Sequence, residues 1–270
     1  MLKHKTVLIT GSTRGIGREI ALRCAKEGAN VVITGKTTEP HPKLPGTIHT
    51  TAEEVEKIGG QAIALELDVR DEVKIQQVVD AAAAHFGGID ILVNNASAIF
   101  LADTTNTSMK RYDLMMGVNV RATYACSQAC IPYLEKGSNP HILNLSPPLN
   151  LDPKWFAPHL AYTMSKYGMS LCTLGLAEEL KSKGIAVNSL WPKTTIATAA
   201  IKHNFPPNIY QASRTPAIVA DAAYYVLTKK ANTCTGQFLI DEDVLKEAGE
   251  TQFDQYANQP GTPLFPDIFL

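Results

Sequence analysis

The chain has 270 residues, of which 45% are hydrophobic and 19% charged, and its formal net charge is −1. This length and composition are typical of one large globular domain or two small ones, and the near-neutral charge argues against a nucleic-acid partner or a polybasic membrane surface. No apolar run approaches the ~20 residues that span a bilayer. The five cysteines are scattered without a C-x-x-C pair. We therefore expect buried thiols in a reducing compartment and no metal site.

The first strand-like run, TVLITG at residues 6–11, lies almost at the N-terminus. The residues before it are too few and too basic for a signal peptide, so we expect a cytoplasmic protein. A Gly-rich turn, Thr10 to Gly17, follows the run, and residues 15–28 then have the spacing of a helix. Glycines in such a turn let a pyrophosphate approach the free N–H groups at the positive end of a helix. The turn predicts nucleotide binding.

Six further apolar runs follow along the chain and alternate with helical patterns. The runs are residues 30–35, 62–69, 89–97, 140–146, 185–192 and 236–241, and the clearest helical patterns are 71–88, 111–137 and 162–184. Strands with little polar alternation, separated by helices, are typical of a parallel sheet that is buried on both faces. We predict an α/β fold with a single Rossmann-type, doubly wound parallel sheet and helices on both faces.

The predicted domain covers residues 1–241 and leaves an acidic, Pro-containing C-terminal tail at 242–270. The stretch from Asp241 onward holds seven acidic residues and only one lysine, and three prolines follow near its end. Two interpretations stay open: an extended tail that wraps the body or a partner, or a mobile terminus.

Several short motifs occur in a characteristic order. They are the Gly-rich turn, Asp68 in LDV, NNAS at 94–97, Asn119 within a long helical pattern, and Tyr162-x-x-x-Lys166. In this order they resemble the short-chain dehydrogenase/reductase family over about residues 5–241. The stretches HPKLPGTI, NLSPPLNL and LWPKT resemble a narrower group within that family.

The resemblance implies a nicotinamide dinucleotide at the carboxyl ends of the strands. The residues expected to contact it are Gly11, Ser12, Thr13, Arg14, Gly15, Ile16, Gly17, Lys36, Asp68, Val69, Asn95, Ala96, Tyr162, Lys166, Pro192 and Thr194.

The second strand ends without the acid that would accept from the ribose hydroxyls of NAD. Gly35 stands at that position and Lys36 follows, while Arg14 lies where NADP-dependent members of the family also have a basic residue. We predict NADP(H), because these cations attract a 2′-phosphate; the alternative is that both are solvated surface charges. In the long loop that follows, His41 and Lys43 either close over the adenosine or belong to a solvated excursion.

Tyr162 and Lys166 are spaced to share one face of a helix. A phenol has a pKa near ~10, so acid–base work at neutral pH needs a nearby cation, and we expect the Lys166 ammonium and the oxidised cofactor to lower the pKa of Tyr162. The resemblance implies that Lys166 also binds the nicotinamide ribose. It further implies that Asn119 kinks its helix and holds a water that links Lys166 to solvent.

The family also has a catalytic serine beyond the fifth strand, and the candidate here is Ser146. Pro147 stands in the serine's place when the strand ends are matched, so the register is displaced by one residue. A longer loop before Tyr162 can bring Ser146 within reach of the substrate oxygen. The alternative is that Ser146 only caps the end of its strand.

The residues around the predicted site suggest an apolar substrate. Trp155, Phe156 and Leu160 precede the catalytic tyrosine, and the expected lid, Ile201 to Pro216, carries aromatic and apolar side chains. These residues either line a substrate pocket or pack the lid. Lys193 replaces a family glycine and would place a cation near the cofactor or near an anionic group of the substrate.

We therefore predict an NADP(H)-dependent oxidoreductase that interconverts a carbonyl and a secondary alcohol on an apolar, lipid-like small molecule. The alternative is a dinucleotide-binding sensor or scaffold protein with little turnover. Family members commonly pair their long helices, here 109–136 and 162–183, and the resemblance therefore implies a homodimer or homotetramer.

Overall fold

The computed structural model describes residues 1–42 and 44–270, so Lys43, expected beside the adenosine, lies outside the described residues. Its centre is a seven-stranded sheet in the order β3-β2-β1-β4-β5-β6-β7, and every pair is parallel. The strands are β1 Thr6–Ile9, β2 Asn30–Gly35, β3 Gln61–Glu66, β4 Ile91–Asn94, β5 His141–Asn144, β6 Ala186–Trp191 and β7 Phe238–Ile240. This order confirms the predicted doubly wound sheet.

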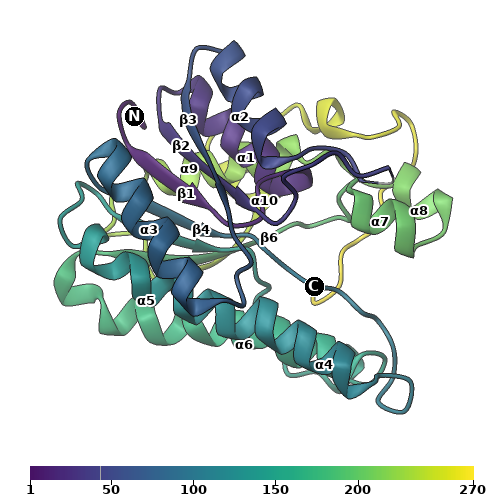
Figure 1. The fold of residues 1–270 in the computed structure, drawn as a ribbon. Coiled ribbons are helices and arrows are strands. Elements are labelled where there is room, and N and C mark those ends of the chain that lie inside the picture. The colour runs from purple at the N-terminus through teal and green to yellow at the C-terminus, as the bar shows by residue number, and fades with distance from the viewer. Residues whose placement is uncertain (43) are drawn as a thin grey trace.

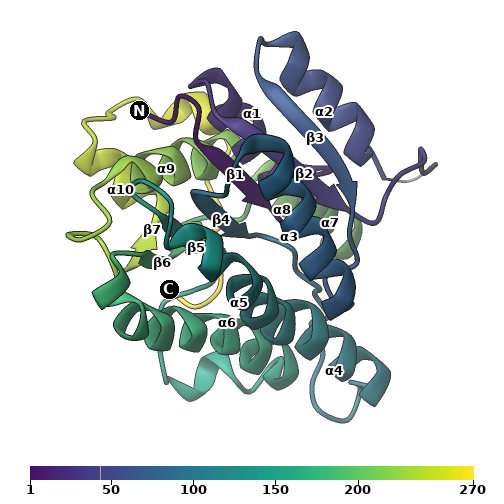
Figure 2. The ribbon, with the colours of Figure 1, turned by 60° about the vertical axis from the view of Figure 1, so that its left-hand side comes forward.

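Helices form one layer on each face of the sheet (Figures 1 and 2), with α1, α2, α9 and α10 on one face and α3, α5 and α6 on the other. The α-helices are α1 Gly15–Lys26, α2 Ile48–Lys57, α3 Glu72–Phe86, α4 Met109–Met115, α5 Ala122–Leu134, α6 Leu160–Glu179, α7 Ala199–Asn204, α8 Pro207–Gln211, α9 Ala217–Thr228 and α10 Asp241–Glu247. The shorter turns are a π-helical turn at Met116–Arg121 and 3-10 turns at Pro153–Trp155, Lys181–Lys183 and Phe253–Tyr256. None of the described helices is both long and apolar enough to span a membrane.

The period of two along each strand divides the hydrophobic core into two halves. On β1, Val7 and Ile9 pack in the cluster that contains Ile20 of α1, whereas Leu8 packs in the cluster that contains Ile75 of α3. All five side chains are at most 1% exposed. A strand that is buried on both faces needs apolar residues at every position, which explains the unbroken apolar runs of the sequence.

The predicted tail begins with a helix instead of extended chain. Asp241 starts α10, and three acidic residues in its first turn favour the positive end of that helix. Glu242 forms an ion pair with Nη1 of Arg214 at 2.7 Å and accepts from Nζ of Lys193 at 2.7 Å. Further on, the backbone carbonyl of Ile268 accepts from the Trp191 indole at 3.0 Å. Residues of the tail therefore contact the body of the domain at α10 and again near its end.

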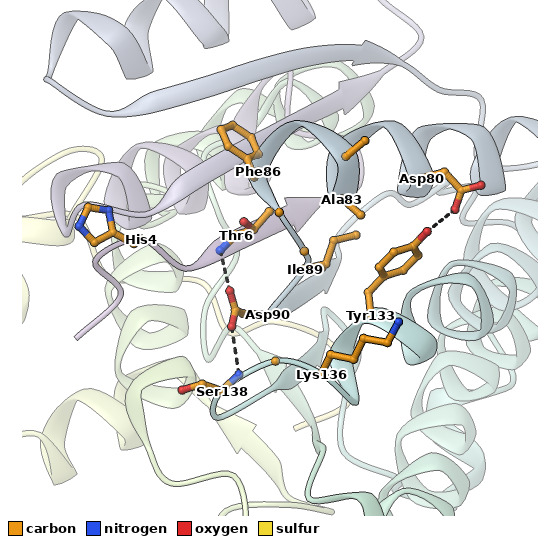
Figure 3. Close-up of a pocket in the computed structure, with 14 residues that line it drawn as sticks. His4, Thr6, Asp80, Ala83, Phe86, Ile89, Asp90, Tyr133, Lys136 and Ser138 are labelled. Atoms are coloured by element: carbon orange, nitrogen blue, oxygen red, sulfur yellow. Dashed lines mark hydrogen bonds between the residues drawn. The ribbon is translucent and has the colours of Figure 1, made fainter.

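A cavity of about 610 Å³ lies at the amino ends of the strands, the edge opposite to the predicted site (Figure 3). At its centre the Asp90 carboxylate accepts from the backbone N–H of Thr6 at 3.0 Å, the backbone N–H of Ser138 at 3.2 Å and Nζ of Lys5 at 3.0 Å. One side chain thus joins the beginnings of β1, β4 and β5.

Replacing this carboxylate should destabilise the fold. Asp90→Ala is expected to lower the free energy of unfolding by ~1–3 kcal/mol, because it removes the acceptor of two backbone N–H groups. Asp80 lines the same cavity but is exposed, so Asp80→Ala should change stability by less than ~0.5 kcal/mol. Urea denaturation of the two variants compares them, and equal losses would show that Asp90 does not join the strands as described.

Candidate active site

The Gly-rich turn between β1 and α1 has the geometry of an anion cradle. Gly11 and Gly15 have φ values of 67° and 56°, the left-handed region in which a glycine meets no steric penalty. Helix α1 begins at Gly15, and its N-cap, Arg14, makes no side-chain capping hydrogen bond. The first N–H groups of the helix therefore remain available to a phosphate.

Close packing against the end of β4 keeps this turn in place. A Cβ atom added to Gly17 would lie 2.4 Å from Nδ2 of Asn95. That amide donates to the backbone carbonyls of Thr10 at 2.9 Å and Gly11 at 3.0 Å. The N–H of Ala96 donates to the Thr10 hydroxyl at 3.0 Å. The expected cofactor residues Asn95 and Ala96 thus lie directly against the turn and shape it.

The end of β2 has no room for the acid that an NAD enzyme uses. A Cβ atom at Gly35 would lie 2.7 Å from the methyl group of Thr13. Lys36 is largely exposed, and its ammonium lies 3.8 Å from the Asp68 carboxylate. Asp68 also accepts from Nε of Arg70 at 3.0 Å, and these hydrogen bonds, together with the Lys36 charge, lower the pKa of Asp68 to about 2.

Arg14 connects the Gly-rich turn to the loop after β2. Its guanidinium donates to the Thr37 hydroxyl at 3.0 Å and to the backbone carbonyl of Pro45 at 2.9 Å. Beside it lies a second cavity of about 570 Å³, which Lys202 also lines, together with Arg18 and the two glutamates that pair with it, Glu19 and Glu54. Arg14 and Lys202, which have no carboxylate partner among the described residues, would face the phosphates of a dinucleotide bound at the start of α1.

Four other expected cofactor residues are all buried: Ser12, Val69, Pro192 and Thr194. The Ser12 hydroxyl donates to the backbone of β1 and accepts from the backbone N–H of Thr34, so it serves the strands. Val69 is buried at the carboxyl edge, as is Pro192 after β6. The buried hydroxyl of Thr194 has no partner among the described residues, and a bound dinucleotide at this edge could supply one. The cradle and this unpaired hydroxyl fit a nicotinamide dinucleotide.

Tyr162 and Lys166 lie on the first turns of α6, packed toward the ends of β5 and β6. They are 5% and 2% exposed. Nζ of Lys166 donates to the backbone carbonyl of Leu145 at 2.7 Å and lies 5.1 Å from the ring centroid of Trp191. Burial lowers the pKa of Lys166 to about 7. A buried ammonium of this kind is stabilised by any negative charge that enters the site.

The expected lowering of the pKa of Tyr162 is not present in the chain alone. Burial raises the pKa of this phenol well above its ordinary value, and the nearby carboxylate of Asp267 raises it further. The physical reason is that desolvation disfavours the phenolate, while Lys166 donates to the Leu145 carbonyl and the Met169 sulfur and not to the phenol.

Asn119 lies where the expected distortion of the long helix occurs. The π-helical turn at Met116–Arg121 separates α4 from α5 and contains this residue, which is fully buried. Its side chain accepts from the N–H of Ala98 at 2.7 Å and donates to the Ser165 hydroxyl at 2.9 Å. Asn119 therefore fastens the loop after β4 to α6, one residue before Lys166.

Among the described residues, Ser146 makes no hydrogen bond with Tyr162. Its hydroxyl belongs to a series of hydrogen-bonded, buried polar side chains near the carboxyl ends of β4, β5 and β6. Its hydroxyl lies 2.8 Å from that of Ser189, which lies 2.8 Å from the hydroxyl of Thr173. The Asn144 amide donates to Thr173 at 2.8 Å and accepts from the Asn94 amide at 2.9 Å. In this arrangement the Ser146 hydroxyl lies against Ser189 of β6, and its strand-end role and its catalytic role remain two predictions.

Lys193 contacts the C-terminal tail. Its ammonium pairs with Glu242 of α10 at 2.7 Å, and that hydrogen bond raises the pKa of Lys193. The cation therefore holds the tail on the domain.

Aromatic side chains gather around Tyr162, including Trp155 and Phe156 from the preceding loop. The sequence did not indicate two further neighbours of Tyr162, Phe269 and Asp267, which come from the last residues of the sequence. Phe269 is buried against the Tyr162 ring, and Asp267 is partly buried and close enough to raise the pKa of Tyr162. Their sequence neighbourhood, FPDIFL, carries no motif that could have identified them.

The chain matches the family model described as short chain dehydrogenase over residues 5–207. It belongs to the short-chain dehydrogenase family, whose members are oxidoreductases that bind a nicotinamide dinucleotide. Within this family it is similar to hydroxysteroid dehydrogenase-like protein 2 of Homo sapiens, at 58% identity, and of Danio rerio, at 57% identity, each over 265 residues. These matches cover 98% of this chain and 63% of each relative. A crystal structure of a short chain dehydrogenase from Mycobacterium thermoresistibile superimposes with a TM-score of 0.94 at 50% identity, over 100% of this chain and 96% of that one.

The match to the two relatives confirms the narrower resemblance carried by HPKLPGTI, NLSPPLNL and LWPKT. The chain spans 63% of the length of these relatives.

A double-mutant cycle tests the role of Ser146. Ser146→Ala and Ser189→Ala should each lower the free energy of unfolding by ~1–3 kcal/mol, because each leaves a buried partner unsatisfied. The double variant should lose less than the sum, since the two hydroxyls share one hydrogen bond. Chemical denaturation of the four proteins gives the coupling energy.

The turnover of the same variants separates the two roles. We expect kcat per folded molecule to stay near the native value for both, measured on any carbonyl or alcohol that the native protein converts. A loss of ~100- to 1,000-fold confined to Ser146→Ala would mean that this hydroxyl donates to the substrate oxygen after all.

Proposed function

We propose that the protein is an NADP(H)-dependent oxidoreductase that interconverts a carbonyl and a secondary alcohol on an apolar, lipid-like substrate. The observation that carries the proposal is the buried pair Tyr162 and Lys166 at the carboxyl edge of the sheet, inside an aromatic cluster. The anion cradle after β1 opens on the same edge. An acid–base group, a hydride carrier and an apolar surface thus meet in one place.

When bound, the dinucleotide supplies the hydride in reduction and takes it up in oxidation. The Tyr162 hydroxyl gives its proton to the carbonyl oxygen during reduction and takes one from the alcohol during oxidation. Its ring is held by α6, so the hydroxyl is oriented before substrate arrives. Lys166, whose pKa burial lowers to about 7, favours the phenolate whenever it is protonated.

The preference for NADP(H) is supported by sterics as well as by charge. The Thr13 methyl group occupies the space of any side chain at position 35, so the acid that binds the ribose of NAD cannot be placed there. Lys36 directly follows position 35, and Arg14 lies close by, where it donates to the Thr37 hydroxyl. Lys36 is only weakly held by Asp68 at 3.8 Å, and a 2′-phosphate would compete for it.

A homo-oligomer is supported by the exposed apolar face of α5 and α6. Tyr124, Met164, Leu171 and Leu174 are 56%, 40%, 57% and 52% exposed. Large apolar side chains gathered on neighbouring helices mark an interaction surface. We propose that two copies pair these helices, as the sequence resemblance implied.

A sensor or scaffold protein with little turnover remains the second candidate. It is favoured by the contact of the Ser146 hydroxyl with Ser189, because a serine engaged at the strand ends would be less available to a substrate oxygen. Tyr162 and Lys166 are nevertheless both present in the site, which is the reason to prefer the enzyme.

The cofactor preference can be measured by ligand-induced stabilisation. NADPH should raise the melting temperature more than NADH, with ~2.7 kcal/mol of stabilisation at a hundredfold excess over Kd. Lys36→Asp should reverse the ranking, because it replaces attraction to a 2′-phosphate by repulsion. Lys136→Asp is the matched control, since it makes the same charge change at the opposite edge of the sheet. Equal shifts from both cofactors in the native protein would contradict the proposal.

The proton carrier can be tested by removing a single hydroxyl. Tyr162→Phe should lower kcat by ~100- to 10,000-fold and leave NADPH binding nearly unchanged. Tyr133→Phe is the control, because it also removes one phenolic hydroxyl, which donates to Asp80 at 2.7 Å at the opposite edge of the sheet. It should cost some stability and keep kcat. Native kcat in Tyr162→Phe would exclude Tyr162 as the proton carrier.

A further inference from the structure

Residues 264–270, called here the C-terminal segment, pair with the chain that follows β6. The N–H of Thr195 donates to the carbonyl of Phe265 at 3.0 Å, and the N–H of Asp267 donates to the carbonyl of Lys193 at 3.1 Å. These are only a few hydrogen bonds at the edge of the domain, so the segment can be released without opening the sheet.

The segment places Phe269 in a cage of aromatic rings. Phe269 is 1% exposed and stacks on Tyr162 with an interplanar angle of 24°. Both ribbon views place the C-terminal end between the sheet and α6 (Figures 1 and 2). We call the surrounding rings the aromatic box; their centroid distances to Phe269 are 6.0 Å for Trp155, 6.1 Å for His159, 6.3 Å for Tyr162, 5.3 Å for Tyr167 and 5.9 Å for Trp191.

Phe269 reaches the box in a strained conformation. Its φ is 77°, in the left-handed region that residues with a Cβ atom rarely adopt. A backbone of this kind persists only where the surrounding contacts outweigh the strain, and it is found at ligand clamps and switch regions. The contacts of the ring in the box are what hold the segment closed.

The segment also brings a polar group into the box. The backbone carbonyl of Ile268 accepts from Nε1 of Trp191 at 3.0 Å. If the segment leaves, this buried donor needs another acceptor. A molecule that replaces the segment therefore has two features: a ring of about the size of phenyl and an oxygen acceptor close to it.

We propose that the aromatic box is the substrate subsite next to Tyr162, that it takes a six-membered ring bearing a nearby oxygen, and that Phe269 occupies it in competition with the substrate. This inference rests on the proposed function for the identity of Tyr162, but it names the chemical class of the substrate and the group that excludes it. Neither of the two cavities described above is lined by Tyr162, in agreement with a subsite that the chain itself fills.

Release of the segment also changes the surroundings of the proton carrier. Asp267, whose pKa burial raises to about 7, lies close enough to Tyr162 and Lys166 to influence both. When the segment leaves, this carboxylate leaves with it, and a group that raises the pKa of both Tyr162 and Lys166 is removed.

The first test measures competition for the box. Phe269→Ala should bind 1-phenylethanol at least ~10-fold more tightly than the native protein, because the competing ring is gone. Phe265→Ala is the matched control, since Phe265 lies in the same segment but is 45% exposed, and it should bind like the native protein. The two tryptophans of the chain both belong to the box, so their fluorescence reports binding directly. 2-Octanol has no ring, so we expect Phe269→Ala to bind it no more tightly than the native protein does.

The second test uses the native chain and so does not depend on how the variants fold. Saturating 1-phenylethanol should speed hydrogen exchange in the peptide that contains residues 264–270 and leave the exchange of β4 unchanged. Neither test requires turnover or NADPH, so they can succeed or fail independently of the proposed function. Binding by Phe269→Ala that is equal to or weaker than native, or slower exchange of the segment with ligand, would show that Phe269 is a fixed wall and overturn the proposal.

Discussion

The hydrogen bond from the Lys166 ammonium to the Leu145 carbonyl is the contact on which the site depends. It joins α6 to the chain leaving β5 at 2.7 Å, in surroundings from which water is nearly excluded. A buried ammonium is costly unless it is hydrogen-bonded, so the helix cannot shift without losing this partner. Because Tyr162 lies one turn earlier on α6, the same bond sets the position of the phenol.

Two further connections hold that helix from its other sides. Asn119 reaches it from the π-helical turn through Ser165, and Thr173 reaches the sheet through Asn144. The π-helical turn is what allows an asparagine side chain to leave a long helix at this point. The geometry around Tyr162 and Lys166 is thus held by hydrogen bonds between buried polar groups, inside a core that is otherwise apolar.

The C-terminal segment changes how the site should be understood. The structure shows the candidate pair Tyr162 and Lys166 covered by the protein's own chain, with Phe269 stacked on Tyr162. Burial raises the pKa of the phenol, and Phe269 fills the aromatic box beside it. Under the proposal above, the segment moves before a substrate reaches Tyr162.

The sequence by itself determined the parallel sheet, because strands buried on both faces require unbroken apolar runs, and it determined the Gly-rich turn and the Tyr162–Lys166 pair, because these depend on local spacing. Helices α2, α9 and α10 were not indicated, since charged or alanine-rich stretches carry weaker periodic signals. The direction of the Ser146 hydroxyl, the pairing of Lys193 with Glu242 and the return of Phe269 to the active site were decided only by the tertiary structure. Each is a contact between segments far apart in the chain, and nothing in a local pattern records which distant side chain will be its partner.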